Sequence, residues 1–518
     1  MTFWSFCGAH SVESIFIFMN PNIFQPLTVL GTDGIRQILE KRVAQQKQAV
    51  GIVAGIIEPN GRRIIAYGSF ANGDPRTLDG DTIFEIGPIS KVFTSLVLAD
   101  MVNRSEVALD DPAAKYLPGT IKMPERGGKP ITLLDLSTHR SGLPPLPANL
   151  LARLADEPRN PYPDYCVDDL YQFLSRYTLP RDPGSEFEYS NPGAGLLGHL
   201  LACRTGTDSE SLIRIRVTQP LSMPDTVITP SSSMKQRMAT GHNGTLAAVA
   251  NSDLPTPLAG AGALRSSAND MLTFLEAFLG YKASPLAPAM KAMLEVRRTA
   301  GQNKVGLGWL ICSTEGRDIA WHNGSTGGFR SFVGYDPEKR IGIVLLSNAS
   351  TPIGVDDIGL HLLNPTLPLA NPEPPGPPKH HAEIHIDPML FENYAGRYQV
   401  TPNLILEITR DGDRLFAQGF TQVAGQAIVL PKFELFAESE RRFFAKVLGS
   451  RFRSRGQPRC LDVLAVPSQA ASRVSTGERC DSAGNSTTAT LALLEAQTMQ
   501  WGGAIGGSDA IVSRSSVD

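Results

Sequence analysis

The stretch that decides the fold is Phe84-Glu-Ile-Gly-Pro-Ile-Ser-Lys-Val-Phe-Thr94. It begins within a short apolar run, residues 82–87, which predicts a strand ending at a glycine. It continues into the apolar run of residues 90–102, which predicts a helix. Proline at position 88 fits the first turn of that helix, because the N–H that proline lacks has no partner there. Lys91 comes three residues after Pro88, so both positions share one face of the predicted helix.

Strand patterns flank a helical middle of the chain. A predicted amphipathic helix over residues 34–48 is followed by two apolar runs, 50–58 and 62–70, across a Pro-Asn-Gly turn that is typical of a β-hairpin. Residues 90–300 are mainly helical in pattern. Further predicted strands cover residues 306–312, 319–322, 331–335 and 341–347. The two groups of strands could pair into one antiparallel sheet with helices packed on it, so the expected fold class is α+β.

Composition divides the chain into five segments. Residues 1–33 are a weakly specified apolar leader, and residues 34–363 form the main domain. Residues 364–385 are a linker, because seven of the fourteen residues from 365 to 378 are proline and favour an extended spacer. Residues 386–447 alternate apolar and polar side chains and predict a small all-β domain. Residues 448–518 contain no lysine and eleven serines, and predict a disordered tail that is either natural or out of frame with the ancestral gene.

Charge and composition exclude several classes of function. Lys plus Arg number 48 and Asp plus Glu 51 among 518 residues, so the net charge of −3 gives no electrostatic case for a nucleic-acid partner. No apolar run reaches the ~18 residues of an integral membrane segment. The leader has no Lys or Arg before Arg36, which makes it a poor secretory signal. The six cysteines form no C-x-x-C pair, and no metal or other cofactor is predicted.

Two further short motifs follow the first along the chain. They are Tyr189-Ser-Asn191, and His322-Asn-Gly324-Ser325 after the strand predicted to begin at residue 319. Together with Lys91, these motifs resemble in type and order the S-x-x-K, Y-x-N and K-T-G or H-x-G elements of the serine β-lactamase and penicillin-binding protein superfamily. The resemblance covers about residues 36–360. It is strongest to the class C-like branch, which holds class C β-lactamases, AmpH-type D-alanyl-D-alanine carboxypeptidases and endopeptidases, and family VIII carboxylesterases.

The resemblance implies a fold, a reaction and a set of residues. The implied fold is an antiparallel sheet flanked by helices with a helical subdomain, followed here by the small all-β domain. The implied reaction is acylation of a serine by a β-lactam, a D-Ala-D-Ala peptide or a small ester, and then hydrolysis. The substrate is thus a small molecule or a peptidoglycan peptide, and the implied compartment is extracytoplasmic. The implied catalytic residues are Lys91 and Tyr189, and the implied substrate-binding residues are Asn191, His322, Gly324 and Ser325.

One departure lies at the centre of the resemblance. The family pattern puts the nucleophilic serine where this chain has Pro88, which has neither a hydroxyl nor a backbone N–H. In this family that N–H is one of two oxyanion-hole donors, and the resemblance assigns the other to Ser325. Ser90 is assigned a supporting role and His139 a structural one. Two functions stay open: a serine hydrolase impaired by Pro88, or a silenced homologue that binds a peptidoglycan-like ligand or a protein partner.

Overall fold

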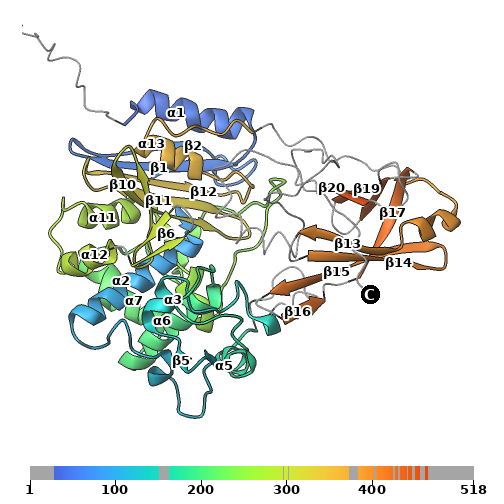
Figure 1. The fold of residues 1–518 in the computed structure, drawn as a ribbon. Helices are drawn as coiled ribbons and strands as arrows, with labels where there is room; N and C mark the ends of the chain where they lie inside the picture. The colour runs from blue at the N-terminus through green and yellow to red at the C-terminus, as the bar shows by residue number, and fades with distance from the viewer. Residues whose placement is uncertain are drawn as a thin grey trace, which may run out of the picture.

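The fold is described from a computed structural model of the chain (Figure 1). Most of the predicted leader, residues 373–382 of the predicted linker and residues 465–518 lie outside the described residues. The structure describes residues 29–464 except for 151–161, 163, 296, 301–302, 373–382, 402–403, 424–425, 430–431, 440–441, 446–449 and 455–460.

The main domain is built on an eight-stranded antiparallel sheet with the order β2-β1-β12-β11-β10-β9-β8-β7. The hairpin of β1 (Gly51–Glu58) and β2 (Gly61–Gly68) lies beside β12 (Ile341–Ser347), with Ala54 opposite Leu345. Strands from both ends of the domain therefore share one sheet, which confirms the sequence prediction. The remaining strands are β7 (Arg298–Ala300), β8 (Asn303–Val305), β9 (Leu310–Thr314), β10 (Arg317–Ser325) and β11 (Arg330–Asp336).

Helices cover both faces of this sheet (Figure 1). On one face lie α1 (Thr32–Glu40), which continues into a π-helical turn over Lys41–Gln45, and α13 (Asp356–Leu363). On the other face lie α2 (Ser90–Asn103) and α11 (Ala268–Phe278), whose Phe93 and Phe274 rings stack with centroids 4.4 Å apart. Because both faces are covered, β1 and β12 are buried along almost their whole length and read as continuous apolar runs.

A helical subdomain packs beside the sheet around α6 (Asn191–Thr205) (Figure 1). Small residues let α10 (Ala259–Gly262) and the turn before it approach α6 closely, since a Cβ added at Gly195 would lie 2.8 Å from the carbonyl oxygen of Pro257. The other helices are α3 (Leu133–Ser137), α5 (Val167–Arg176), α7 (Ser209–Ile213), α8 (Gln219–Leu221), α9 (Ser232–Gln236) and α12 (Ala287–Met293). A small hairpin of β4 (Glu125–Arg126) and β5 (Lys129–Pro130) projects from it.

A separate two-stranded sheet carries the chain into α2. In it β3 (Ile83–Glu85) pairs with β6 (Arg265–Ser267), with Phe84 opposite Ser266. The predicted strand over residues 82–87 is therefore present but does not belong to the large sheet.

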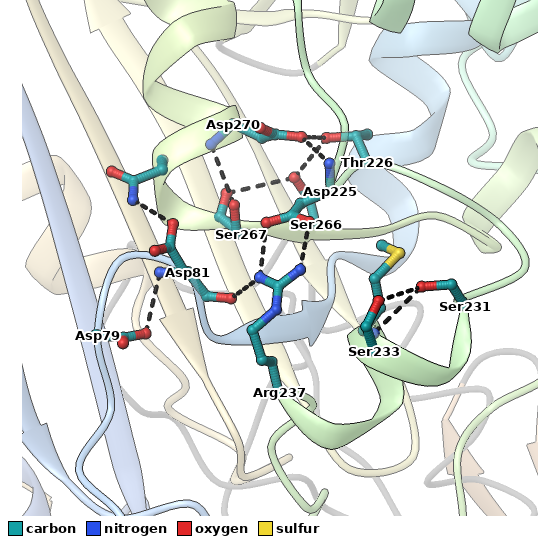
Figure 2. A network of polar contacts seen from close by, with 12 residues as sticks. Asp79, Asp81, Asp225, Thr226, Ser231, Ser233, Arg237, Ser266, Ser267 and Asp270 are labelled. Carbon is teal, nitrogen blue, oxygen red and sulfur yellow. Dashed lines mark hydrogen bonds and ion pairs between the residues drawn. The ribbon is translucent and has the colours of Figure 1, made fainter.

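A polar network fixes this small sheet to the segments around it (Figure 2). The guanidinium of Arg237 donates to both carboxylate oxygens of Asp225, at 2.8 and 2.6 Å, and to the carbonyl oxygen of Asp81 at 2.6 Å. Asp270, in the first turn of α11, accepts from the Asp225 amide at 2.8 Å and from the Thr226 hydroxyl at 2.9 Å. The network therefore ties the chain just before β3 to the start of α11.

A second antiparallel sheet follows the linker, with the order β13-β14-β15-β17-β18-β19-β20 and β16 paired to β15. The sheet extends past the predicted domain boundary at residue 447: its strands β19 and β20 lie within the segment that the sequence predicted to be a disordered tail. The run Arg451-Phe-Arg alternates over too few residues to predict a strand by itself. The strands are β13 (Gly396–Thr401), β14 (Leu404–Asp411), β15 (Arg414–Val423), β16 (Gln426–Val429), β17 (Phe433–Ser439), β18 (Arg442–Ala445), β19 (Ser450–Ser454) and β20 (Leu461–Leu464).

Candidate active site

The junction between β3 and α2 holds Pro88 in a single 3-10 turn, Gly87–Ile89. Gly87 has a φ of +51°, in the left-handed region. A Cβ at this position would lie 3.1 Å from Cγ2 of Thr326 and 3.3 Å from the amide nitrogen of Ser325. Glycine is therefore favoured both by the backbone conformation and by the close approach of the end of β10. The junction and the third motif are thus held against each other.

Lys91 lies in the first turn of α2 and is only 3% exposed. Its Nζ donates to Oδ1 of Asn191 at 2.8 Å and to the carbonyl oxygen of Ala261 at 2.7 Å, and it lies 4.6 Å from the centroid of the Tyr189 ring. Among the described residues, no carboxylate lies within ion-pair distance of Nζ. Burial therefore holds the pKa of Lys91 well below its usual range, which favours an amine that can accept a proton.

Tyr189 and Asn191 are positioned by the start of α6. The hydroxyl of Ser190 caps this helix by accepting from the amide of Gly193 at 3.0 Å, and it donates to the carbonyl oxygen of Pro144 at 2.9 Å. Asn191, the first helical residue, donates from Nδ2 to the carbonyl oxygen of Pro145 at 3.2 Å while its Oδ1 accepts from Lys91. The second motif therefore meets the first through direct side-chain contact.

The third motif lies on β10, at the strand end that meets the junction. His322 is buried and donates from Nδ1 to the carbonyl oxygen of Asn323 at 2.6 Å. Burial and the nearby Lys91 lower the pKa of His322 to about 3, so its imidazole is neutral near pH 7. A Cβ added at Gly324 would lie 2.2 Å from the carbonyl oxygen of Ile86, so only glycine fits there. Ser325 ends the strand.

Ser90 has a hydroxyl that is already used within the fold. Its Oγ donates to the carbonyl oxygen of Gly87 at 2.7 Å and accepts from the amide of Leu264 at 3.0 Å, and the residue is fully buried. This geometry agrees with the supporting role assigned from the sequence. It leaves Ser90 without a hydroxyl hydrogen directed at a substrate.

Two residues that the sequence did not assign to the site also contact it. His139 accepts at Nδ1 from the amide of Ser190 at 3.2 Å, and its ring centroid lies 4.5 Å from that of Tyr189. Asp356, in the first turn of α13, accepts from Nδ2 of Asn323 at 2.5 Å, and burial raises its pKa to about 6. The sequence around His139 resembles a segment of the family, so it could have pointed to this residue. No sequence pattern pointed to Asp356, because 33 residues separate it from Asn323.

Among residues 29–464 with the gaps given above, no three His, Cys, Asp or Glu side chains are grouped so that they could hold a metal ion. The helices described there are all too short or too polar to cross a membrane.

The site brings together the buried Lys91, Tyr189 and the strand that carries Gly324, where β3 leads into α2 beside the antiparallel sheet. This arrangement is typical of the serine β-lactamase and penicillin-binding protein class of hydrolases. Comparison with known proteins agrees. Residues 35–364 match the model of the Beta-lactamase family, and the chain belongs to this family.

Curated relatives fall in the branch indicated by the motifs. The D-alanyl-D-alanine-carboxypeptidase/endopeptidase AmpH of Escherichia coli K12 is 30% identical over 323 residues, which cover 58% of this chain and 80% of the relative. A beta-lactamase of Pseudomonas fluorescens is 27% identical over 358 residues, covering 61% of this chain and 94% of the relative.

Solved structures share the fold. A beta-lactamase/D-alanine carboxypeptidase from Yersinia pestis, complexed with citrate, superposes with a TM-score of 0.54 at 25% identity, covering 61% of this chain and 92% of that one. An octameric penicillin-binding protein homologue from Pyrococcus abyssi superposes with a TM-score of 0.58 at 23% identity, covering 84% of this chain and 98% of that one. The second likeness therefore also takes in residues beyond the family match.

Proposed function

We propose that this chain carries the acyl-transfer site of a class C-like serine hydrolase in which Pro88 replaces the nucleophile, so that turnover is severely impaired. The observation that carries the proposal is the position of Pro88. It lies in the turn that begins α2, three residues before the buried Lys91, and the junction is packed against the end of β10. The substrate class is a β-lactam, a D-Ala-D-Ala peptide or a small ester, as the names of the relatives support.

Pro88 removes two functions at once. It has no hydroxyl to form an acyl-enzyme bond, and no N–H to donate to the oxyanion of a tetrahedral intermediate. Loss of one oxyanion-hole donor costs about 10²–10³ in turnover even when a nucleophile is present. Ser90 is not a substitute, because its hydroxyl serves Gly87 and Leu264.

The remaining residues have proposed roles that rest on their contacts within the protein and on the resemblance to the family. Lys91, held by Asn191 and Ala261, and Tyr189, in contact with Lys91 through its ring, form the proton-transfer pair. Asn191 orients Lys91 and hydrogen-bonds the substrate amide. His322, whose imidazole is neutral, takes the place of a lysine beside the substrate or Tyr189 without that residue's positive charge. Gly324 and Ser325 provide the strand edge along which the substrate lies.

A second candidate function is a silenced homologue that binds a peptidoglycan-like ligand without turnover. The observation that favours it is that the site around Pro88 keeps its hydrogen bonds: Lys91 still has two acceptors, and the capping of α6 is complete. Loss of the nucleophile has therefore not been followed by loss of the packing that would hold a ligand.

Two variants at position 88, compared with the unaltered chain, test whether the missing nucleophile limits turnover. Hydrolysis of a chromogenic cephalosporin and of a short-chain p-nitrophenyl ester is measured for the unaltered chain, Pro88→Ser and Pro88→Ala. We expect little or no activity in the unaltered chain and in Pro88→Ala, and a gain of at least about 10² in Pro88→Ser. Pro88→Ala is the matched control, because it restores the backbone N–H without a hydroxyl.

The outcome that contradicts the proposal is equal activity in the unaltered chain and in Pro88→Ser. A penicillin or fluorophosphonate adduct on the unaltered chain, found by intact-mass spectrometry, would contradict it as well. For the silenced homologue, thermal shift with a D-Ala-D-Ala peptide should stabilise the unaltered chain, and an L-Ala-L-Ala peptide serves as the control ligand.

A further inference from the structure

A small cavity lies beside the proposed catalytic residues. Its volume is about 10 Å³, which is about the size needed for one water molecule. Ser137, His139, Tyr189, Trp309 and His322 are among the residues that line it, and each of these is less than a tenth exposed. Polar atoms that face this cavity therefore have little contact with bulk solvent.

The two histidines that line the cavity are fixed in opposite tautomers by the backbone. The Nδ1 of His139 accepts a hydrogen bond from the amide of Ser190, so the proton of its neutral ring is on Nε2. The Nδ1 of His322 hydrogen-bonds a carbonyl oxygen, which can only accept, so Nδ1 carries the proton and Nε2 is a bare acceptor. Burial, with Lys91 and His322 nearby, holds the pKa of His139 well below its usual range, which keeps its ring neutral.

Trp309, which also lines the cavity, carries an unused donor. Its side chain is fully buried, and its Nε1 has no hydrogen-bond partner among the described residues. A buried N–H without a partner is unfavourable, because it has lost its hydrogen bonds to water and gained none in the protein. Two donors and one acceptor, on three residues that line the cavity, match the two to four partners that a buried water usually has.

The geometry points to one water molecule bound in this cavity, accepting from Nε2–H of His139 and Nε1–H of Trp309 and donating to Nε2 of His322. His139 is then a positioning residue rather than only a structural one, because it acts through the water on the orientation of the His322 ring beside Tyr189. The water site stands on the contacts just described. Only the effect of His139 on turnover rests on the proposed function.

Asparagine at position 139 separates the two roles of this histidine. Its Oδ1 can take the place of Nδ1 and accept from Ser190, but its side chain is too short to reach the water from the position of Nε2. His139 has a φ of +56°, a conformation that asparagine tolerates better than most residues. His139→Asn should therefore fold. Trp309→Phe removes the other donor while it keeps most of the ring volume, and gives an independent variant.

The direct test is a high-resolution crystal structure of the full chain and of both variants. We expect a water within hydrogen-bond distance of Nε2 in both His139 and His322, and its loss or displacement in His139→Asn and in Trp309→Phe. An empty cavity in the unaltered chain would overturn the inference, as would a direct His139–His322 hydrogen bond or an unmoved water in both variants.

The positioning role is tested in the Pro88→Ser background. Adding His139→Asn should lower kcat about 10-fold, the equivalent of about 1.4 kcal/mol for one hydrogen bond, with KM unchanged and with a shifted acidic limb of the pH profile. Unchanged kcat and pH profile would overturn the positioning role. If Pro88→Ser itself shows no activity, the proposed function fails, and the crystal structures of the unaltered chain and its variants still decide the water site.

Discussion

Replacement of Ser90 by alanine tests the structural role of the residue next to Lys91. The hydroxyl of Ser90 accepts from the amide of Leu264 and donates to the carbonyl oxygen of Gly87, and no solvent reaches it. The carbonyl of Gly87 also accepts from the backbone amide of Ser90, so it keeps one partner. The amide of Leu264 loses its acceptor in a buried position, which costs about 1–3 kcal/mol. Ser90→Ala should therefore lower the free energy of unfolding by about 1–3 kcal/mol.

The assay is urea unfolding followed by tryptophan fluorescence and by circular dichroism. Ser232→Ala, at an exposed position on α9, is the control and should stay within about 0.5 kcal/mol of the unaltered chain. Equal unfolding midpoints for Ser90→Ala and the unaltered chain would refute the reasoning. Loss of a covalent adduct in Ser90→Ala, if one forms in the unaltered chain, would show instead that Ser90 is a nucleophile.

Two further predictions concern the strand beside the junction and the network of Figure 2. Gly324→Ala should destabilise the fold by at least about 2 kcal/mol in urea unfolding, because the added Cβ would lie 2.2 Å from the carbonyl oxygen of Ile86. Gly119→Ala is the control and should not destabilise the fold, because no atom lies within 4 Å of the added Cβ. Burial raises the pKa of Asp270 from 3.8 to about 6, so the native state binds this proton more tightly than the unfolded state, and stability should fall as pH rises through that range. Asp270→Asn keeps an acceptor for Thr226 and should abolish this part of the pH dependence, and an unchanged profile would contradict the assignment.

Local sequence patterns predict much of the secondary structure of the main domain. The hairpin of β1 and β2 is predicted by two apolar runs across Pro59-Asn60-Gly61, and it forms there. An added Cβ at Gly87 or Gly324 would lie close to backbone atoms of another segment. Both positions therefore favour glycine, and a short sequence motif can show that requirement. Patterns were weakest where strands are short, as in β19 and β20, because four or five residues carry too little periodicity.

For the candidate site, the sequence predicted the residue types but not the contacts among them. The types and order of Lys91, Tyr189, Asn191 and His322 were sufficient to predict a family and a reaction class, because each residue type suits one chemical role. The contacts among them were not predictable, since the Nζ of Lys91 meets an amide 100 residues away and a carbonyl 170 residues away.

The sequence by itself determined the family, the main antiparallel sheet and the loss of a hydroxyl at Pro88, because these depend on residue type and short-range spacing. Tertiary structure alone decided what the neighbouring polar groups do. It directs the hydroxyl of Ser90 to Leu264, 174 residues away, sets His139 and His322 in opposite tautomers, and brings Asp356 to Asn323. The physical reason is that hydrogen-bond partners and burial depend on which distant segments the fold brings together, and a residue's type does not specify them.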